Sequence, residues 1–326
     1  MKGRRLPWLL LGALFHAQTV AAEVLILRAG DETVHHEAVT GPHGCEPVTI
    51  DAKLFVPERG RPVPAVIVVP GSLGVGPNHE QHAETLVAEG YAVCVVDPFG
   101  PRAVSSTVAD QTHYSFAASS YDVLATLREL RQRPEIDADR IAAQGHSRGG
   151  SAVTIAACRR FADPIVGPDV GLAAAYAVYP WCGQQFLDPS IGTTSVRAII
   201  GDLDEWCSVQ QVQAQVQAMR AAGGDATIRI VRGAHHSFDR NEDVYTIEEA
   251  SVAPSAPTTM LADDGSMIMP HVGEPDPDLV DRDVFVAAVD AGFGRRGAAI
   301  GGIGDQPDLF RADMLSFYAR TLGSAH

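Results

Sequence analysis

The chain has 326 residues, of which 46% are hydrophobic and 20% charged, and its formal net charge is −15. This length can bury one sizeable core, and α/β proteins of this size are commonly a single domain. The acidic balance, with no basic stripe beyond the extreme N-terminus, argues against nucleic acid and anionic membranes as partners.

Residues 1–22 have the pattern of a secretory signal peptide. A basic start precedes an apolar stretch at 6–15 that is too short to span a bilayer, and small residues follow up to Ala22. We therefore expect cleavage near Ala22 and a mature domain of residues 23–326. We expect this mature protein to be periplasmic or secreted, without stable membrane insertion.

Strands and helices are predicted to alternate from residue 23 to residue 231. Strands are expected at 23–27, 48–56, 64–69, 91–96, 141–144, 171–179, 196–200 and 226–231. Helices are expected at 78–89, 121–131, 151–161, 209–222 and 308–322. This alternation predicts an α/β fold with a mostly parallel central sheet flanked by helices.

Residues 241–307 interrupt the pattern. They are rich in Pro, Gly and Asp, and residues 258–269 are typical of a hairpin turning at Asp264 and Gly265. The segment is predicted to be an insertion after the last strand. It is either a lid or substrate wall, or a surface insertion without a role in the site.

The five cysteines are Cys45, Cys94, Cys158, Cys182 and Cys207. Cys94 and Cys158 lie in apolar surroundings and are expected to be buried thiols. In an oxidising compartment Cys182 and Cys207 are the best candidates for a disulfide. No Cys/His spacing typical of zinc is present, so neither a metal nor another cofactor is expected.

A G-x-S-x-G motif covers residues 145–149, with Ser147 at its centre. The apolar run before it predicts a strand and the residues after it predict a helix, which is the context of an exposed nucleophile on a sharp strand-to-helix turn. Glycines around the serine leave room for that turn, and the helix directs its first N–H groups at the serine. We therefore predict that Ser147 is a nucleophile.

A serine nucleophile needs an acid and a base, which in this type of motif follow in the order acid, then histidine. Asp202, Asp204 and Glu205 all follow the strand predicted at 196–200. We choose Asp204, because it lies three residues beyond Gly201 and so extends past the strand into the loop. Asp202 is the alternative and could instead brace the turn.

The base is expected from His235 or His236, which follow the last strand. Adjacent side chains point in different directions, so only one of the two can face Ser147. We favour His236, with Phe238 packing below the loop.

The oxyanion formed during acyl transfer needs two N–H donors. The residue after the nucleophile, Arg148, is expected to supply one through its backbone. The second is expected from the loop after the strand at 64–69, where Gly71 permits close approach. Ser72 is our choice for it, and Leu73 is the alternative.

Four segments carry a resemblance to a known family: P-G-S-L-G at 70–74, D-A-D-R-I-A-A-Q-G-H-S-R-G-G at 137–150, G-D-L-D at 201–204 and A-H-H-S-F at 234–238. In these segments the chain resembles the dienelactone hydrolase family of the α/β-hydrolase superfamily. The family's Ala-x-His-x-Phe pattern supports His236 over His235. Family members that cleave dienelactone use a cysteine nucleophile, so Ser147 points instead to broader ester or lactone hydrolysis.

The expected function is a serine hydrolase that cleaves small carboxylic esters or lactones through an acyl-enzyme intermediate, without a cofactor. The expected roles are Ser147 as nucleophile, His236 as base, Asp204 as its orienting acid, and Arg148 and Ser72 as the oxyanion hole. The alternatives are an exported serine peptidase on the same fold and a non-catalytic binding protein. The sequence leaves the oligomeric state open.

Overall fold

A computed structural model describes residues 20–30, 34–41, 47–58 and 61–323. Most of the predicted signal peptide, and Cys45, lie outside these described residues. Within them most buried apolar side chains form one large cluster around a central sheet, and Phe99, Tyr114 and Ala118 form a second, small one. No helix in the described part of the chain is long and apolar enough to cross a membrane.

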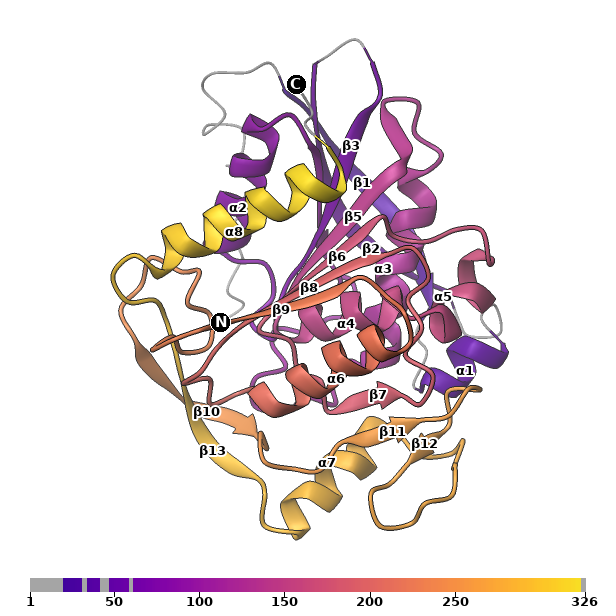
Figure 1. Ribbon diagram of the computed structural model, residues 1–326, viewed down its shortest axis with the longest axis vertical. Coiled ribbons are helices and arrows are strands. Elements are labelled where there is room, and N and C mark those ends of the chain that lie inside the picture. The colour runs from indigo at the N-terminus through magenta and orange to yellow at the C-terminus, as the bar shows by residue number, and fades with distance from the viewer. Residues whose placement is uncertain (1–19, 31–33, 42–46, 59–60, 324–326) are drawn as a thin grey trace.

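The central sheet has eight strands in the order β1-β2-β4-β3-β5-β6-β8-β9 (Figure 1). The strands are β1 (Val20–Gly30), β2 (Pro47–Pro57), β3 (Val63–Val69), β4 (Ala92–Asp97), β5 (Ile136–His146), β6 (Ala174–Val178), β8 (Ser195–Gly201) and β9 (Ala226–Val231). Pairing is antiparallel between β1 and β2 and between β2 and β4, and parallel from β4 to β9. The predicted mostly parallel sheet is confirmed, and every strand predicted from the pattern is present in it.

Helices cover both faces of the sheet (Figure 1). On one face lie α2 (Pro77–Ala88) and the closing helix α8 (Gln306–Thr321), and on the other lie α3 (Phe116–Leu130), α4 (Arg148–Ala157) and α6 (Val209–Ala221). A short α1 (His35–Thr40) and α5 (Arg159–Val166) lie beside each other at the periphery. Between these layers β3 and β4 are buried almost throughout, as an apolar run without alternation requires.

One predicted helix is divided in the structure. The pattern predicted a single helix over 151–161, but α4 ends at Ala157 and α5 begins at Arg159. Between them Cys158 is extended, and the N–H of Arg159 donates to the carbonyl of Ser190 at 2.7 Å. A contact with a distant loop therefore breaks a helix that local spacing favours.

The predicted insertion has its own secondary structure. It contains β10 (Tyr245–Val252), β11 (Thr259–Leu261), β12 (Met267–Ile268), α7 (Asp281–Asp290) and β13 (Arg295–Ile300). The predicted hairpin is present as β11 and β12, and Gly265 in its turn has φ +81°. β10 pairs with β13, while β11 adds parallel to β7 (Gln184–Phe186) and so attaches the insertion to the body of the molecule (Figure 1).

Candidate active site

Ser147 lies on the sharp turn between β5 and α4. Its backbone has φ 54° and ψ −115°, a conformation that side-chain-bearing residues rarely adopt. Such strain persists only where the surrounding structure imposes it, and it is common at functional sites. The serine thus projects from the end of a central strand.

Two glycines of the motif make this turn possible. A Cβ on Gly145 would lie 1.9 Å from the carbonyl oxygen of Gly149, and a Cβ on Gly149 would lie 2.5 Å from the carbonyl oxygen of Val69. The backbones of the strand, the turn and the neighbouring β3 loop therefore touch with no room for a side chain.

The structure brings Ser147, His236 and Asp204 together. His236 Nε2 lies 2.9 Å from Ser147 Oγ, and His236 Nδ1 lies 2.7 Å from Asp204 Oδ2. Both distances are those of hydrogen bonds. These residues follow the ends of β5, β9 and β8, which are separate along the chain but lie close together in the sheet, in the order β5-β6-β8-β9.

Asp204 and His236 are held from the side by Trp206 and Cys207, which lie in the same loop as Asp204. The backbone N–H groups of Trp206 and Cys207 each donate to Asp204 Oδ1 at 2.8 Å. The indole of Trp206 stacks on the His236 ring at 5.4 Å and 19°, and its Nε1–H donates to the carbonyl of Ala299 at 3.0 Å. The acid and the base are thus fixed by one loop and by the end of β13.

The rival acid and base candidates have other partners. Asp202 Oδ1 accepts the N–H of Gly233 at 2.6 Å, so it braces the turn before the histidines. Glu205 accepts the N–H of Ala299 at 2.9 Å. His235 is half-buried, whereas the adjacent His236 is buried and carries the bond to Ser147.

The residues predicted for the oxyanion hole border the nucleophile. A Cβ on Gly71 would lie 3.2 Å from the Cβ of Ser147, so the β3 loop closely approaches it. Ser72 is buried, whereas the side chain of the alternative, Leu73, is 42% exposed. Arg148 begins α4 directly after Ser147, at the positive end of the helix dipole.

Two hollows meet at Ser147. The first, here called the His236 hollow, is bounded by His79, His146, Tyr179, His236 and Arg240 among others. The second, here called the Arg148 hollow, is bounded by Arg148, Phe116, Trp181, Cys207 and Phe285 among others. Ser147, Ser72 and Trp206 line both hollows, so a bound molecule can extend from the nucleophile in two directions.

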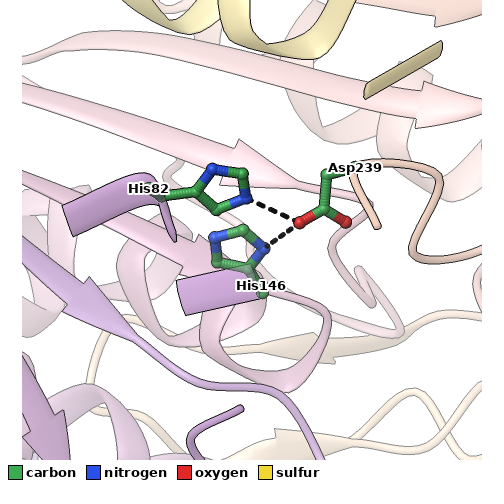
Figure 2. Close-up of side chains that lie close together, drawn as sticks. All are labelled: His82, His146 and Asp239. Carbon is green, nitrogen blue, oxygen red and sulfur yellow. Dashed lines mark hydrogen bonds and ion pairs between the residues drawn. The ribbon is translucent and has the colours of Figure 1, made fainter. Parts of the chain in front are cut away.

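A buried polar cluster lies behind the nucleophile (Figure 2). His146 precedes Ser147, His82 comes from α2, and Asp239 follows His236 by three residues. The carboxylate of Asp239 lies 2.7 Å from His82 Nε2, and it accepts the Tyr179 hydroxyl at 2.7 Å and the Asn78 amide at 3.0 Å. The cluster joins α2, the strand ends and the loop that carries His236.

The electrostatics of this cluster favour a charged Asp239 and a neutral His146. Burial opposes ionisation of Asp239, but the hydrogen bonds from His82 and Asn78 hold the pKa of its carboxyl well below the usual value. Burial lowers the pKa of His146 well below its usual value and that of His79 to about 3. His146 is therefore neutral at physiological pH.

Among the described residues two groups bring ligand atoms within reach of one metal ion: His82, His146 and Asp239, and Asp204, Cys207 and His236. In the first group, hydrogen bonds to His82, Tyr179 and Asn78 already occupy the Asp239 carboxylate. In the second, Asp204 and His236 bond to each other and to Ser147. Hydrogen bonding accounts for both groups, and the expectation that no cofactor is needed stays a prediction.

The predicted disulfide between Cys182 and Cys207 is wrong for this structure, in which both are free buried thiols. Cys207 follows Asp204 in the same loop, and its sulfur lies within 4.8 Å of ligand atoms of Asp204 and His236. It thus contributes to the wall of the site. Burial raises the pKa of Cys182 to about 12, so this thiol is protonated. Cys94 and Cys158 are buried free thiols, as expected.

The fold and the serine on its turn place the protein among the α/β-hydrolases. The family model for "Dienelactone hydrolase family" matches residues 50–261, more than half of the chain. The chain therefore belongs to the dienelactone hydrolase family, which confirms the resemblance found in its motifs. With Ser147 at the nucleophile position, this chain is a serine hydrolase that acts on esters or lactones.

Solved structures agree with this fold. A putative dienelactone hydrolase from Klebsiella pneumoniae subsp. pneumoniae MGH 78578 is 21% identical with a TM-score of 0.50, over 68% of this chain and 89% of that one. Esterase Est22 is 13% identical with a TM-score of 0.52, over 93% of this chain and 81% of that one. These similarities support the fold alone.

One curated relative matches a short stretch. A non-reducing polyketide synthase, ausA, from Aspergillus calidoustus is 43% identical over 51 residues. The match covers 16% of this chain and 2% of that protein.

Sequence reasoning missed the buried cluster and the side chains of the Arg148 hollow. His79 and His82 are spaced by three on a predicted helix, and Asp239 closely follows His236, so a shared helix face and proximity to the base were available signals. Phe285 gave no such signal, because only the folded insertion brings it to Trp181.

Proposed function

We propose that the protein hydrolyses carboxylic esters or lactones through an acyl-enzyme on Ser147. The observation that supports this most directly is the continuous chain of hydrogen bonds from Ser147 Oγ through His236 to Asp204, with distances of 2.9 and 2.7 Å. A serine hydroxyl becomes a useful nucleophile when an oriented imidazole can accept its proton.

In the first half of the reaction Ser147 Oγ attacks the acyl carbon while His236 Nε2 takes the hydroxyl proton. The carbonyl oxygen becomes an oxyanion, and the tetrahedral intermediate expels the alcohol oxygen. His236 gives its proton to this leaving oxygen, so the alcohol departs neutral and the acyl group stays on Ser147.

In the second half water takes the place of the alcohol. His236 accepts a proton from water, the resulting hydroxide attacks the acyl-enzyme, and the Ser147 oxygen leaves with the proton from His236. Asp204 keeps the proton-bearing Nδ1 of His236 oriented throughout, and it stabilises the imidazolium formed in each half.

The backbone N–H groups of Arg148 and Ser72 are proposed to bind the oxyanion. The position of Arg148 on the first turn of α4 and the contact of the Gly71 backbone with Ser147 support this assignment. Donors of this kind are worth about 3 kcal/mol each in such sites.

Ser147→Ala is expected to lower kcat for p-nitrophenyl acetate at least about a thousandfold, because the covalent path is lost. The melting temperature should change little, because Ala removes only one oxygen at this position. A fluorophosphonate probe should label the wild type at Ser147 and leave the variant unlabelled. Turnover equal to that of the wild type would refute the nucleophile, and absent labelling of an intact wild type would favour a binding protein.

A further inference from the structure

A third hollow, here called the α7 pocket, lies between the insertion and the body of the protein. It contains roughly 610 Å³ of unfilled space, part of it open to solvent. Most of its lining is apolar, including Trp181, Pro257, Met269, Phe285 and Ala288. An apolar lining of this kind is typical of a binding site for an apolar group.

The α7 pocket borders the Arg148 hollow and shares part of its lining with it. Trp181, Ala253 and Phe285 line both this pocket and the Arg148 hollow, which reaches Ser147. Ala253 and Phe285 belong to the insertion, whereas Trp181 follows β6. The insertion therefore forms one wall of the path that a substrate chain would follow from Ser147 toward this pocket.

Aromatic rings form the boundary between the hollow and the pocket. Trp181 lies 4.4 Å from Phe116 and stacks on Phe285 at 5.6 Å, measured between ring centroids. The buried guanidinium of Arg148 lies over the Phe116 ring at 4.0 Å. Arg148 is thereby shielded by aromatic faces, and the path beyond it presents apolar surface.

The wall is attached firmly to the catalytic side of the molecule. Asp281, the first residue of α7, is buried and accepts the backbone N–H of Phe116 at 2.8 Å and the Gln184 amide at 2.7 Å. These bonds fix the helix that carries Phe285 and Ala288 relative to the Arg148 hollow. The insertion is therefore a built part of the site.

The chemistry of the leaving group gives the two hollows different roles. His236 must reach the departing alcohol oxygen, and His236 lines only the first of the two hollows that meet at Ser147. The His236 hollow is thus suited to the alcohol part of a substrate. The Arg148 hollow and the α7 pocket extend from Ser147 on the other side.

We propose that the α7 pocket binds the acyl part of the substrate, and that this part is an extended apolar chain. The proposal rests on the proposed function, because it assigns a substrate class to the same serine. It gives the insertion the role of a substrate wall that selects esters by their acyl group.

The test fills the pocket and compares acyl lengths. Ala288→Phe places a ring in the α7 pocket, and kcat/KM is measured for p-nitrophenyl octanoate and p-nitrophenyl acetate. The ratio of octanoate to acetate is expected to fall roughly tenfold, the size of effect that a few displaced methylenes produce. Val286→Phe is the matched control: it adds the same ring on the exposed face of α7, where Val286 is 48% exposed, and should leave the ratio unchanged.

Other outcomes separate the possibilities. An unchanged ratio in a folded Ala288→Phe variant overturns the proposal while leaving the function of Ser147 standing. Loss of octyl acetate turnover without loss of octanoate turnover would place the alcohol in the pocket and also overturns it. If Ala288→Phe lowers the melting temperature strongly, the smaller change Ala287→Leu on the same wall decides. Failure of the wild type to hydrolyse acetate through Ser147 would instead refute the proposed function.

Discussion

Asp204 uses its two carboxylate oxygens for different purposes. One oxygen bonds to His236 at 2.7 Å, and the other accepts the N–H groups of Trp206 and Cys207 at 2.8 Å each. The second pair of bonds prevents rotation of the carboxylate. A fixed carboxylate selects the histidine tautomer whose Nδ1 carries the proton, which leaves Nε2 free to act as a base toward Ser147.

The burial of His35 predicts how the free energy of unfolding depends on pH. It is fully buried with its ring edge against Phe161, and neither ring nitrogen has a hydrogen-bond partner among the described residues. Burial lowers its pKa from 6.5 to about 3. Between these values the unfolded chain binds a proton that the folded chain does not, so His35 lowers the stability as the pH falls below 6.5.

His35→Leu should therefore stabilise the protein, and its advantage should be about 2 kcal/mol larger at pH 5 than at pH 8. Urea unfolding at both pH values measures this difference. Other buried histidines, such as His79, act in both proteins and cancel in the comparison. His113→Leu, at a side chain that is 61% exposed, should show no such pH-dependent gain. An advantage that is equal at both pH values would contradict a neutral buried His35.

At the level of single residues, the sequence predicted what chain order and local spacing determine. Ser147, Asp204 and His236 each follow a strand in the order that the chemistry needs, and the structure brings these three together. The predicted disulfide between Cys182 and Cys207 is absent, because an oxidising compartment does not by itself bring two sulfur atoms into bonding geometry. The environment of Arg148 could not be predicted, since its partners come from distant loops.

The ends of β8 and β9 are in direct contact, and Gly201 makes that contact possible. A Cβ on Gly201 would lie 2.0 Å from the carbonyl oxygen of Ala234, which also accepts the N–H of Leu203 at 3.0 Å. Gly201 precedes the loop of Asp204, and Ala234 precedes His236. The close approach of the two backbones sets the spacing of acid and base.

Gly201→Ala should push these two loops apart and misplace His236 against Asp204. We expect kcat/KM for p-nitrophenyl acetate to fall at least about a hundredfold, because small displacements at a catalytic centre are costly. Gly41→Ala is a control, since no described atom outside its immediate neighbours would lie closer than 3.8 Å to the new Cβ. Full activity of a folded Gly201→Ala variant would show that the loops relax without consequence.

Elements with strong local patterns were predictable, and those that depend on distant partners were not. An apolar run predicts the buried strand β3, and helical spacing of apolar residues predicts the helix α6. In contrast, α7 begins at Asp281, whose carboxylate bonds to Phe116 and Gln184, and β10 exists through its pairing with β13. No local periodicity in a segment rich in Pro, Gly and Asp reveals such contacts.

For the molecule as a whole, we propose export with removal of residues 1–22. The support is the basic and apolar N-terminal pattern that ends in small residues at Ala22. Sequencing the N-terminus of protein recovered from the extracytoplasmic fraction of its native host should find Glu23 first. Recovery of chains that retain residues 1–22 would refute cleavage. In the full chain Ala22 pairs with Phe55 at the start of β1, so processing would shorten this edge strand.

The end of the insertion that returns to the sheet is bonded to His236, the proposed catalytic base. The N–H of Gly301 donates to the carbonyl of His236 at 2.9 Å, and Ala299 accepts the indole N–H of Trp206. Ala299 and Gly301 lie beyond residue 261, where the family match ends. Replacing the proposed substrate wall with that of another esterase would thus require residues 298–301 to stay in place. The part of the insertion before β13 could be replaced, whereas β13 itself supports the residues around Ser147.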